Sequence, residues 1–438
     1  MCRIYKNIVL LSLLATGGVL AETVEELDED TSLNEIVRQR MSESGTDMPF
    51  SFCGDLNLTA LFIKQDENEG FDGSSVSLQG NIGLVYVGKG NGFGYGAEIG
   101  VKTDSGLIKQ GAPIVKTAFI FVEADKIGVI RLGYTNTAAD LFCICGDKCL
   151  VGYGGAGSGN LGIFYNKSAG STVDTGFTYD DSRAAKIAWL SPTVSGFSMG
   201  LSFTPDSRDA NLFRTKHCQM KSAHEKSCFS EMCAAYAKNI ITGGIAYEWG
   251  APDDFNAKIS ASGWFGRGKS GINDTLEVHN VRAYNVGAII GCKDLKISLG
   301  YTDAGKSLLP KKYATADIAP FDASRDYSLD DADVGLRPGA NAGQIYSIGA
   351  AYTYKKLVVS VGYFKSIVKF SDSEEATADV ISLAFEYTFD KSIGVYTEYD
   401  HISSNSCDRA RAYGKACDLS STGKNKANVL MLGTKINI

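Results

Sequence analysis

The stretch Ile381-Ser-Leu-Ala-Phe-Glu-Tyr-Thr-Phe389 places a large apolar side chain at every second position and a small or polar one between them. Successive side chains of a β-strand point to opposite faces, so this stretch predicts a strand with one apolar and one polar face. The same alternation recurs in residues 76–86, 197–203, 284–291, 295–302, 346–354 and 357–364. The pattern predicts an all-β protein.

Sixteen strands are expected, near residues 52–64, 74–88, 93–103, 115–125, 127–134, 183–191, 196–204, 235–249, 255–266, 283–291, 295–302, 343–353, 357–366, 379–389, 393–401 and 427–438. Short turns alternate between them with longer connections, and the longest connections are 135–182, 205–234, 303–342 and 402–426. A soluble β-sandwich gives no reason for this asymmetry. A transmembrane barrel has long extracellular loops and short periplasmic turns, with aromatic girdles at its strand ends. The fold expected is therefore a 16-stranded antiparallel transmembrane β-barrel.

The polar face of these strands is rich in Gly and Ser and carries isolated charges, as a water-filled lumen requires. The charges expected to face the lumen are Glu98, Lys258, Lys296, Glu386 and Glu398.

The N-terminal region differs from the rest of the chain. Residues 1–21 have the pattern of a secretory signal peptide cleaved after Ala21, with Arg3 and Lys6 before an apolar run. Residues 22–49 hold nine acids and two bases and form either a short helix or a flexible charged arm. Residues 50–438 are the expected barrel. Because this body is nearly neutral, it lacks the basic footprint of nucleic-acid binding.

Four segments, taken in order, resemble the Gram-negative general porins of the alphaproteobacterial type. The segments are Phe119–Tyr134, Arg183–Phe197, Tyr284–Ala288 with Ile297–Gly305, and Leu432–Ile438. The resemblance implies an outer-membrane homotrimer that passes small hydrophilic solutes and ions by diffusion, and whose third long loop folds into the lumen. Two departures are Tyr134, where many relatives have Arg, and the terminal Ile438 in place of Phe.

The resemblance also implies a constriction at which acids of the third loop face a basic wall. Opposed charges there would orient solutes and bias ion selectivity. Strand parity points Arg131 and Lys186 inward, with Arg183 at a strand end, and Asp140 and Asp147 lie in the loop. We expect the three cations to face the two acids; the equal alternative is that each charge is a solvated lumen residue.

The cysteines of an exported chain favour disulfides over metal or redox chemistry. The outer-loop candidates are Cys143, Cys145 and Cys149 in loop three, Cys218, Cys228 and Cys233 in loop four, and Cys407 and Cys417 in loop eight. Cys407–Cys417 is the simplest bridge. The other six suggest one bridge inside each loop and one between the two loops, although connectivity is not fixed by sequence.

Other motifs are weaker. A zinc site at His217, Cys218, His224, Cys228 and Cys233 matches no standard spacing, and the acids Asp326, Asp330, Asp331 and Asp333 match no calcium loop. With four histidines and no nucleophile–base arrangement, neither a catalytic site nor a cofactor is expected. The function expected is passive diffusion of solutes through a porin. Its expected partners are outer-membrane lipid and, where present, lipopolysaccharide. The alternative is a surface adhesin or structural barrel whose loops occlude the lumen.

Overall fold

The computed structural model describes residues 50–66, 73–90, 92–104, 114–154, 184–207, 235–251, 254–270, 277–309, 311, 341–369, 375–390, 392–405 and 424–437. The expected signal peptide and acidic arm lie outside these residues and stay predictions. No helix in the described part of the chain is long and apolar enough to cross a membrane.

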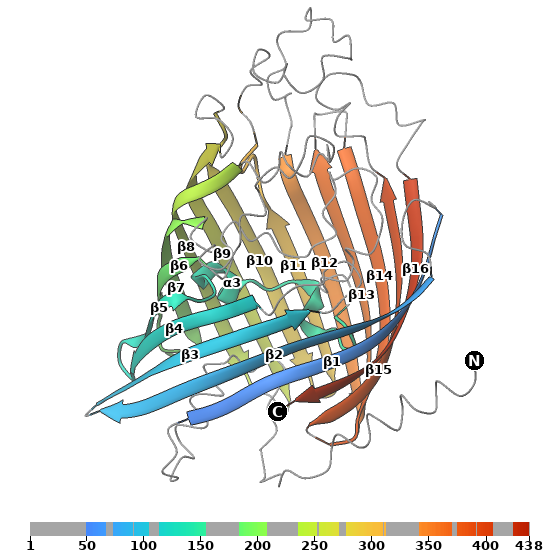
Figure 1. Cartoon of the computed structure of the whole chain (residues 1–438), viewed down its shortest axis with the longest axis horizontal. Helices are drawn as coiled ribbons and strands as arrows, with labels where there is room; N and C mark the ends of the chain where they lie inside the picture. Colours follow the sequence, from blue (N-terminus) through green and yellow to red (C-terminus); the bar gives the residue numbers. More distant parts are fainter. Residues whose placement is uncertain are drawn as a thin grey trace, which may run out of the picture. The chain divides into compact units, whose positions relative to one another are not determined.

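Sixteen antiparallel strands close into one barrel, in which β1 pairs with both β2 and β16 (Figure 1). This confirms the predicted fold class. The strands are β1 (Phe50–Gln65), β2 (Gly73–Gly90), β3 (Phe93–Asp104), β4 (Ile114–Ala124), β5 (Gly128–Tyr134), β6 (Ala185–Leu190), β7 (Phe197–Asp206), β8 (Ala235–Gly250), β9 (Phe255–Ser270), β10 (Val281–Cys292), β11 (Leu295–Asp303), β12 (Asn341–Tyr354), β13 (Leu357–Lys369), β14 (Glu375–Thr388), β15 (Ile393–Asn405) and β16 (Lys424–Asn437).

Several strands extend further toward the long loops than the apolar pattern predicted. β15 continues to Asn405, whereas its alternation ends near Tyr399. The outward positions beyond Tyr399 are His401 and Ser403, so the strand leaves the apolar band while its backbone pairing with β14 continues. Apolar alternation therefore marks only the part of a strand that faces lipid.

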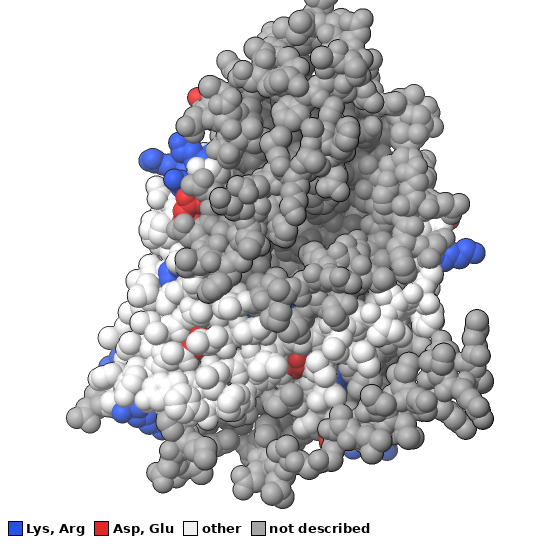
Figure 2. Space-filling view, in the orientation of Figure 1, with Lys and Arg blue, Asp and Glu red and all other residues white. Residues whose placement is uncertain are grey.

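The outer face of the barrel is apolar and has aromatic clusters near its ends. At the periplasmic ends of β1–β3, the Phe50 and Tyr86 rings are 5.1 Å apart and the Tyr86 and Tyr95 rings 6.4 Å apart. Toward the other rim, the Tyr301 and Tyr346 rings are 4.9 Å apart. In the described surface, Figure 2 shows a broad band with few charged side chains. This arrangement matches the apolar belt and interfacial girdles of an outer-membrane barrel.

Residues 135–154, here called the inner segment, follow β5 and run inside the barrel. The segment contains a short helix, α3 (Ala138–Phe142), and a 3₁₀ turn, η1 (Gly146–Cys149). α3 contacts β6–β9 and η1 contacts β11–β13, so the segment follows the inner wall through a large part of its circumference. The third long connection thus begins by folding inward, as expected.

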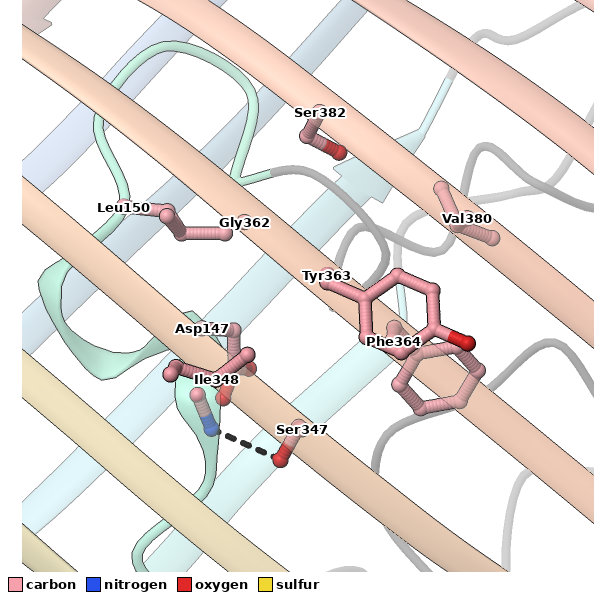
Figure 3. Close-up of a pocket in the computed structure, with 10 residues that line it drawn as sticks. Asp147, Leu150, Ser347, Ile348, Gly362, Tyr363, Phe364, Val380 and Ser382 are labelled. Carbon is pink, nitrogen blue, oxygen red and sulfur yellow. Dashed lines mark hydrogen bonds between the residues drawn. The ribbon is translucent and has the colours of Figure 1, made fainter.

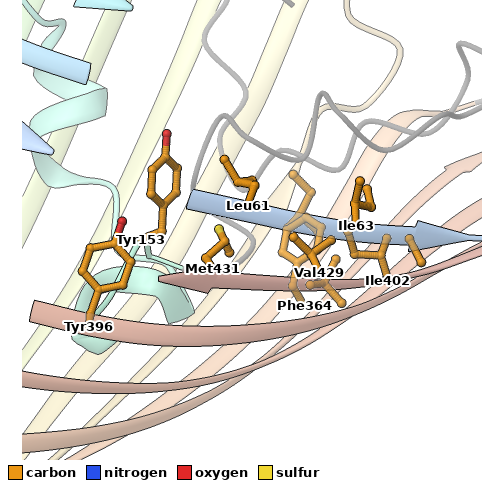
Figure 4. Close-up of a cluster of buried hydrophobic side chains, with 11 residues drawn as sticks. Leu61, Ile63, Tyr153, Phe364, Tyr396, Ile402, Val429 and Met431 are labelled. Carbon is orange, nitrogen blue, oxygen red and sulfur yellow. The ribbon is translucent and has the colours of Figure 1, made fainter. Parts of the chain in front are cut away.

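Two apolar clusters lie on the inner wall. Ala139 of α3 is buried with residues of β8–β10, among them Ile240 and Trp264. Tyr153, near the end of the inner segment, belongs to a second cluster with inward side chains of β1 and β12–β16 (Figure 4). Each cluster contains one residue of the inner segment, Ala139 near its start and Tyr153 near its end. Burial of these apolar side chains therefore holds the segment against the wall near both ends.

Candidate pore constriction

Two buried cations lie where the inner segment leaves the wall. The Lys186 ammonium donates to the carbonyl oxygens of Thr135, at 2.6 Å, and Ala184, at 2.8 Å. The Arg131 guanidinium lies 3.4 Å from the Thr135 hydroxyl and 5.1 Å from the centre of the Phe119 ring. Both side chains are on neighbouring strands, β5 and β6, and are less than 7% exposed. They therefore fix the start of the segment as well as adding positive charge to this wall.

The first turn of α3 is capped from two directions. Thr137 and Asp140 form a capping box: the Thr137 hydroxyl accepts from the Asp140 amide at 3.1 Å, and the Asp140 carboxylate accepts from the Thr137 amide at 3.3 Å. Such a box satisfies helix N–H groups that lack partners within the helix. The next amide, that of Ala138, donates to the Ser202 hydroxyl of β7 at 3.1 Å. The predicted constriction acid Asp140 thus also has a structural role.

Inner-wall glycines allow the segment to lie against the strands. A Cβ added at Gly300 of β11 would be 2.6 Å from the Cys145 Cα, and one added at Gly362 of β13 would be 2.6 Å from a Leu150 methyl. At Gly244 of β8 an added Cβ would collide with Phe142. Real Cβ atoms cannot approach this closely, so the backbone contact depends on the absence of a side chain.

Polar side chains of successive strands hydrogen-bond the backbone of the segment. On β10, the Asn285 side chain accepts from the Ile144 amide at 3.2 Å and donates to its carbonyl oxygen at 3.3 Å. The remaining contacts of this kind are Ser298 of β11 to the Gly146 carbonyl at 2.7 Å, the Gly146 amide to Ser347 of β12 at 2.8 Å, and the Val151 amide to Ser360 of β13 at 3.1 Å. Each bond satisfies a backbone group that the inner segment would otherwise bury without a partner.

Two carboxylates hold the far end of the segment. Glu386 of β14 accepts from the Gly152 amide at 2.9 Å, and Glu398 of β15 accepts from the Tyr153 amide at 2.5 Å. Lys435 of β16 forms an ion pair with Glu386 at 2.9 Å. Hydrogen bonds to a carboxylate are stronger than those between neutral groups, so these contacts hold the end of the inner segment at Gly152 and Tyr153, here called the tip, firmly against the wall.

A gap with about 210 Å³ of empty space, counting space open to solvent, lies between η1 and strands β12–β14 (Figure 3). Asp147 and Leu150 of the inner segment line it, together with Ser347, Phe364 and Ser382 of the wall. Asp147, the second predicted constriction acid, therefore borders a gap between the segment and the strands. Its enclosed part has room for about one water molecule.

The other predicted lumen charges have varied surroundings. Glu98 of β3 is buried and accepts from the Thr117 hydroxyl at 2.8 Å. Lys258 of β9 pairs with Glu248 of β8 at 2.5 Å. Lys296 is exposed near the periplasmic end of β11.

Some predicted residues lie outside the described part of the chain. They are Arg183, Cys218, Cys228, Cys233, Cys407 and Cys417. The opposition of Arg131 and Lys186 to Asp140 and Asp147, like the disulfide pattern, stays a prediction.

Sequence reasoning missed the anchoring residues. Alternation placed Glu386 and Glu398 toward the lumen, but their partners are 234 and 245 residues away in the chain. Asn285 and the wall serines gave no separate signal, because Ser and Asn are common on the polar face of any barrel. Only the path of the inner segment shows what these residues hold.

Comparison with known proteins identifies the family of this chain. A family model described as Gram-negative porin matches residues 41–406. An uncharacterised protein of Rickettsia bellii is 24% identical over 364 residues, covering 72% of this chain and 75% of that protein. An uncharacterised protein of Rickettsia prowazekii is 22% identical and covers 70% of this chain and 69% of its own length.

Solved structures share the fold at low sequence identity. The structure of Salmonella typhi OmpF in complex with daunomycin gives a TM-score of 0.53 at 14% identity, with 88% of this chain and 97% of that chain covered. An anion-selective porin from Comamonas acidovorans gives 0.52 at 14% identity, with 89% and 99% covered. The trimer form of Vibrio cholerae OmpT gives 0.51 at 11% identity, with 89% and 99% covered. Since the family model spans most of the chain, this protein belongs to the Gram-negative porin family and is a porin of the outer membrane.

Proposed function

We propose that small hydrophilic solutes and ions diffuse passively through this barrel past a constriction formed by the inner segment, residues 135–154. The observation that carries the proposal is the chain of wall contacts, in which β10 to β15 each hydrogen-bond the segment. A segment held at each strand is preorganised, so its shape sets the width available to a solute. No reaction is catalysed and no cofactor takes part.

The charges of the constriction favour weak cation selectivity or none. Lys435 is paired with Glu386, which neutralises one inner-wall cation, and two backbone carbonyl oxygens partly screen the charge of Lys186. Arg131 also has a favourable electrostatic interaction with the buried Glu98. Compensated charges create a weaker field in the lumen than an unopposed basic wall would. Asp140 and Asp147 of the segment then add the negative component.

We also propose that the protein is a homotrimer in the outer membrane, in contact with lipid and with lipopolysaccharide where that is present. Support comes from the printed description of Vibrio cholerae OmpT as a trimer, which at 11% identity shares only the fold with this chain. Native mass spectrometry of the detergent-solubilised protein tests the oligomeric state. A monomer under conditions that keep the barrel folded would contradict the trimer.

Single-channel conductance in a planar bilayer under a salt gradient tests the proposed diffusion function. Stepwise insertions with three closing sublevels are expected from an open trimer, with a reversal potential near zero or weakly cationic. A strongly anion-selective reversal potential would contradict the charge argument. A folded barrel that never conducts would instead favour the surface-binding alternative.

A further inference from the structure

Two thiols of the inner segment lie in contact. Cys143 and Cys145 flank Ile144 between α3 and η1, and their sulfur atoms are 3.6 Å apart. Both residues have extended backbone angles, with ψ of 121° at Cys143 and φ and ψ of −126° and 170° at Cys145. In extended chain, residues two apart point to the same side, which explains why the two thiols meet. A disulfide requires about 2.05 Å between the sulfur atoms, so closure needs a further approach of the two side chains.

The backbone between the two cysteines is fixed by the barrel wall. Asn285, which is fully buried, binds both the amide and the carbonyl oxygen of Ile144. Its side-chain nitrogen also donates to the Thr302 hydroxyl at 2.9 Å, which holds the amide group in place. Ile144, the residue between the thiols, is therefore held in one position. The thiols stay neighbours because of this contact with the barrel wall, and no contact with another loop is needed. Preorganisation of this kind favours an intramolecular bond over a bridge to a distant cysteine.

The two thiols differ in exposure and in acidity. Cys143 is half-buried, whereas Cys145 is buried. The hydrogen bond from the Cys143 thiol lowers the pKa of Cys145, and the same bond raises the pKa of Cys143. Because Cys143 is the more exposed thiol, it meets an incoming reagent first, and the neighbouring Cys145 is then placed to attack the mixed disulfide in the second, internal step.

We propose that Cys143 and Cys145 are a dithiol site in the constriction that low-molecular-weight disulfides oxidise to an intraloop disulfide. The Cys143 thiolate attacks one sulfur of the small disulfide, forming a mixed disulfide and releasing one thiolate. The Cys145 thiolate then attacks the Cys143 sulfur, forming the protein disulfide and releasing the second thiolate. The two protons of the cysteines end on the two released thiols, and the small disulfide receives both electrons.

The sequence supplies a peptide that isolates this pair. Trypsin cleaves after Arg131 and after Lys148, and the fragment 132–148 contains Cys143 and Cys145 but no other cysteine. The purified full-length protein in detergent is equilibrated with mixtures of oxidised and reduced glutathione. It is then blocked with N-ethylmaleimide, unfolded and digested. Mass spectrometry of the fragment needs no conducting channel, so its result is independent of the proposed diffusion function.

The expected result is a fragment that loses N-ethylmaleimide labelling at both cysteines as oxidised glutathione increases and is lighter than the dithiol by two hydrogens. Added reduced glutathione should restore the labelling. In Cys145→Ser, we expect the fragment to carry one glutathione on Cys143. The matched control Cys149→Ser should oxidise as the wild type does. Labelling of both cysteines at every glutathione ratio would overturn the proposal, and so would a fragment cross-linked to the peptide of Cys149 or to any other cysteine.

Discussion

Removing the acceptor at Glu398 should detach the far end of the inner segment. The Glu398 carboxylate accepts from the Tyr153 amide at 2.5 Å, and Glu398 is only 1% exposed. Glu398→Ala leaves this buried N–H without its acceptor, which costs about 1 to 3 kcal/mol. Because about 1.4 kcal/mol is a factor of ten in an equilibrium, the population with a detached tip should rise by roughly 5-fold to 150-fold.

Single-channel recording can detect this change. A tip that leaves the wall changes the narrowest part of the lumen, so we expect Glu398→Ala to show frequent current fluctuations and additional conductance levels. Glu386→Ala should act in the same direction, because it removes the acceptor for the Gly152 amide. The double variant should show the largest effect.

The matched control is Glu248→Ala, which removes an inner-wall carboxylate paired with Lys258 and nearly half exposed to solvent. This variant should keep the current noise of the wild type, although the ion selectivity can shift. If Glu398→Ala folds and its current trace matches those of the wild type and Glu248→Ala, the carboxylate does not hold the tip. The reasoning from the Tyr153 contact would then be refuted.

Three further changes test the wall contacts. Gly244→Val places a branched side chain against Phe142, and such overpacking should cost about 1 to 3 kcal/mol, measured as a lower temperature of barrel unfolding in detergent. Asn285→Leu removes the side-chain partner of both backbone groups of Ile144, so the free energy of unfolding should fall by about 1 to 3 kcal/mol for each group. An unfolding transition equal to that of the wild type would show that Asn285 does not hold Ile144. Thr137→Ala removes the N-cap of α3 and should cost about 1 kcal/mol, with Thr137→Ser as the control that restores stability.

The extent of each strand shows how far sequence patterning reaches. Alternation identified every strand of the barrel because the outer face must be apolar wherever it meets lipid. It failed at the loop ends, as in β15 beyond Tyr399, because backbone pairing continues there without an apolar requirement. The number of strands could be predicted because each strand carries its own alternation. The exact strand ends could not, because they depend on backbone hydrogen bonds that almost any residue can make.

The candidate site was predicted less completely. Parity and family resemblance singled out Arg131, Lys186, Asp140 and Asp147 for opposed charge. The structure gives Lys186 and Asp140 additional bonds to the backbone of the inner segment. Such bonds carry no signature in the sequence, because a backbone carbonyl or amide is present at every position.

The sequence alone determined an exported, antiparallel membrane barrel with a polar lumen, since the period of two and the alternation of short and long connections are local features. Only the tertiary structure decided how the lumen is narrowed. Which glycines admit the inner segment, and which carboxylates bind Gly152 and Tyr153, depends on contacts between residues more than 100 positions apart. The physical reason is that strand patterning specifies which face a side chain occupies, whereas a constriction requires two particular side chains on that face to meet.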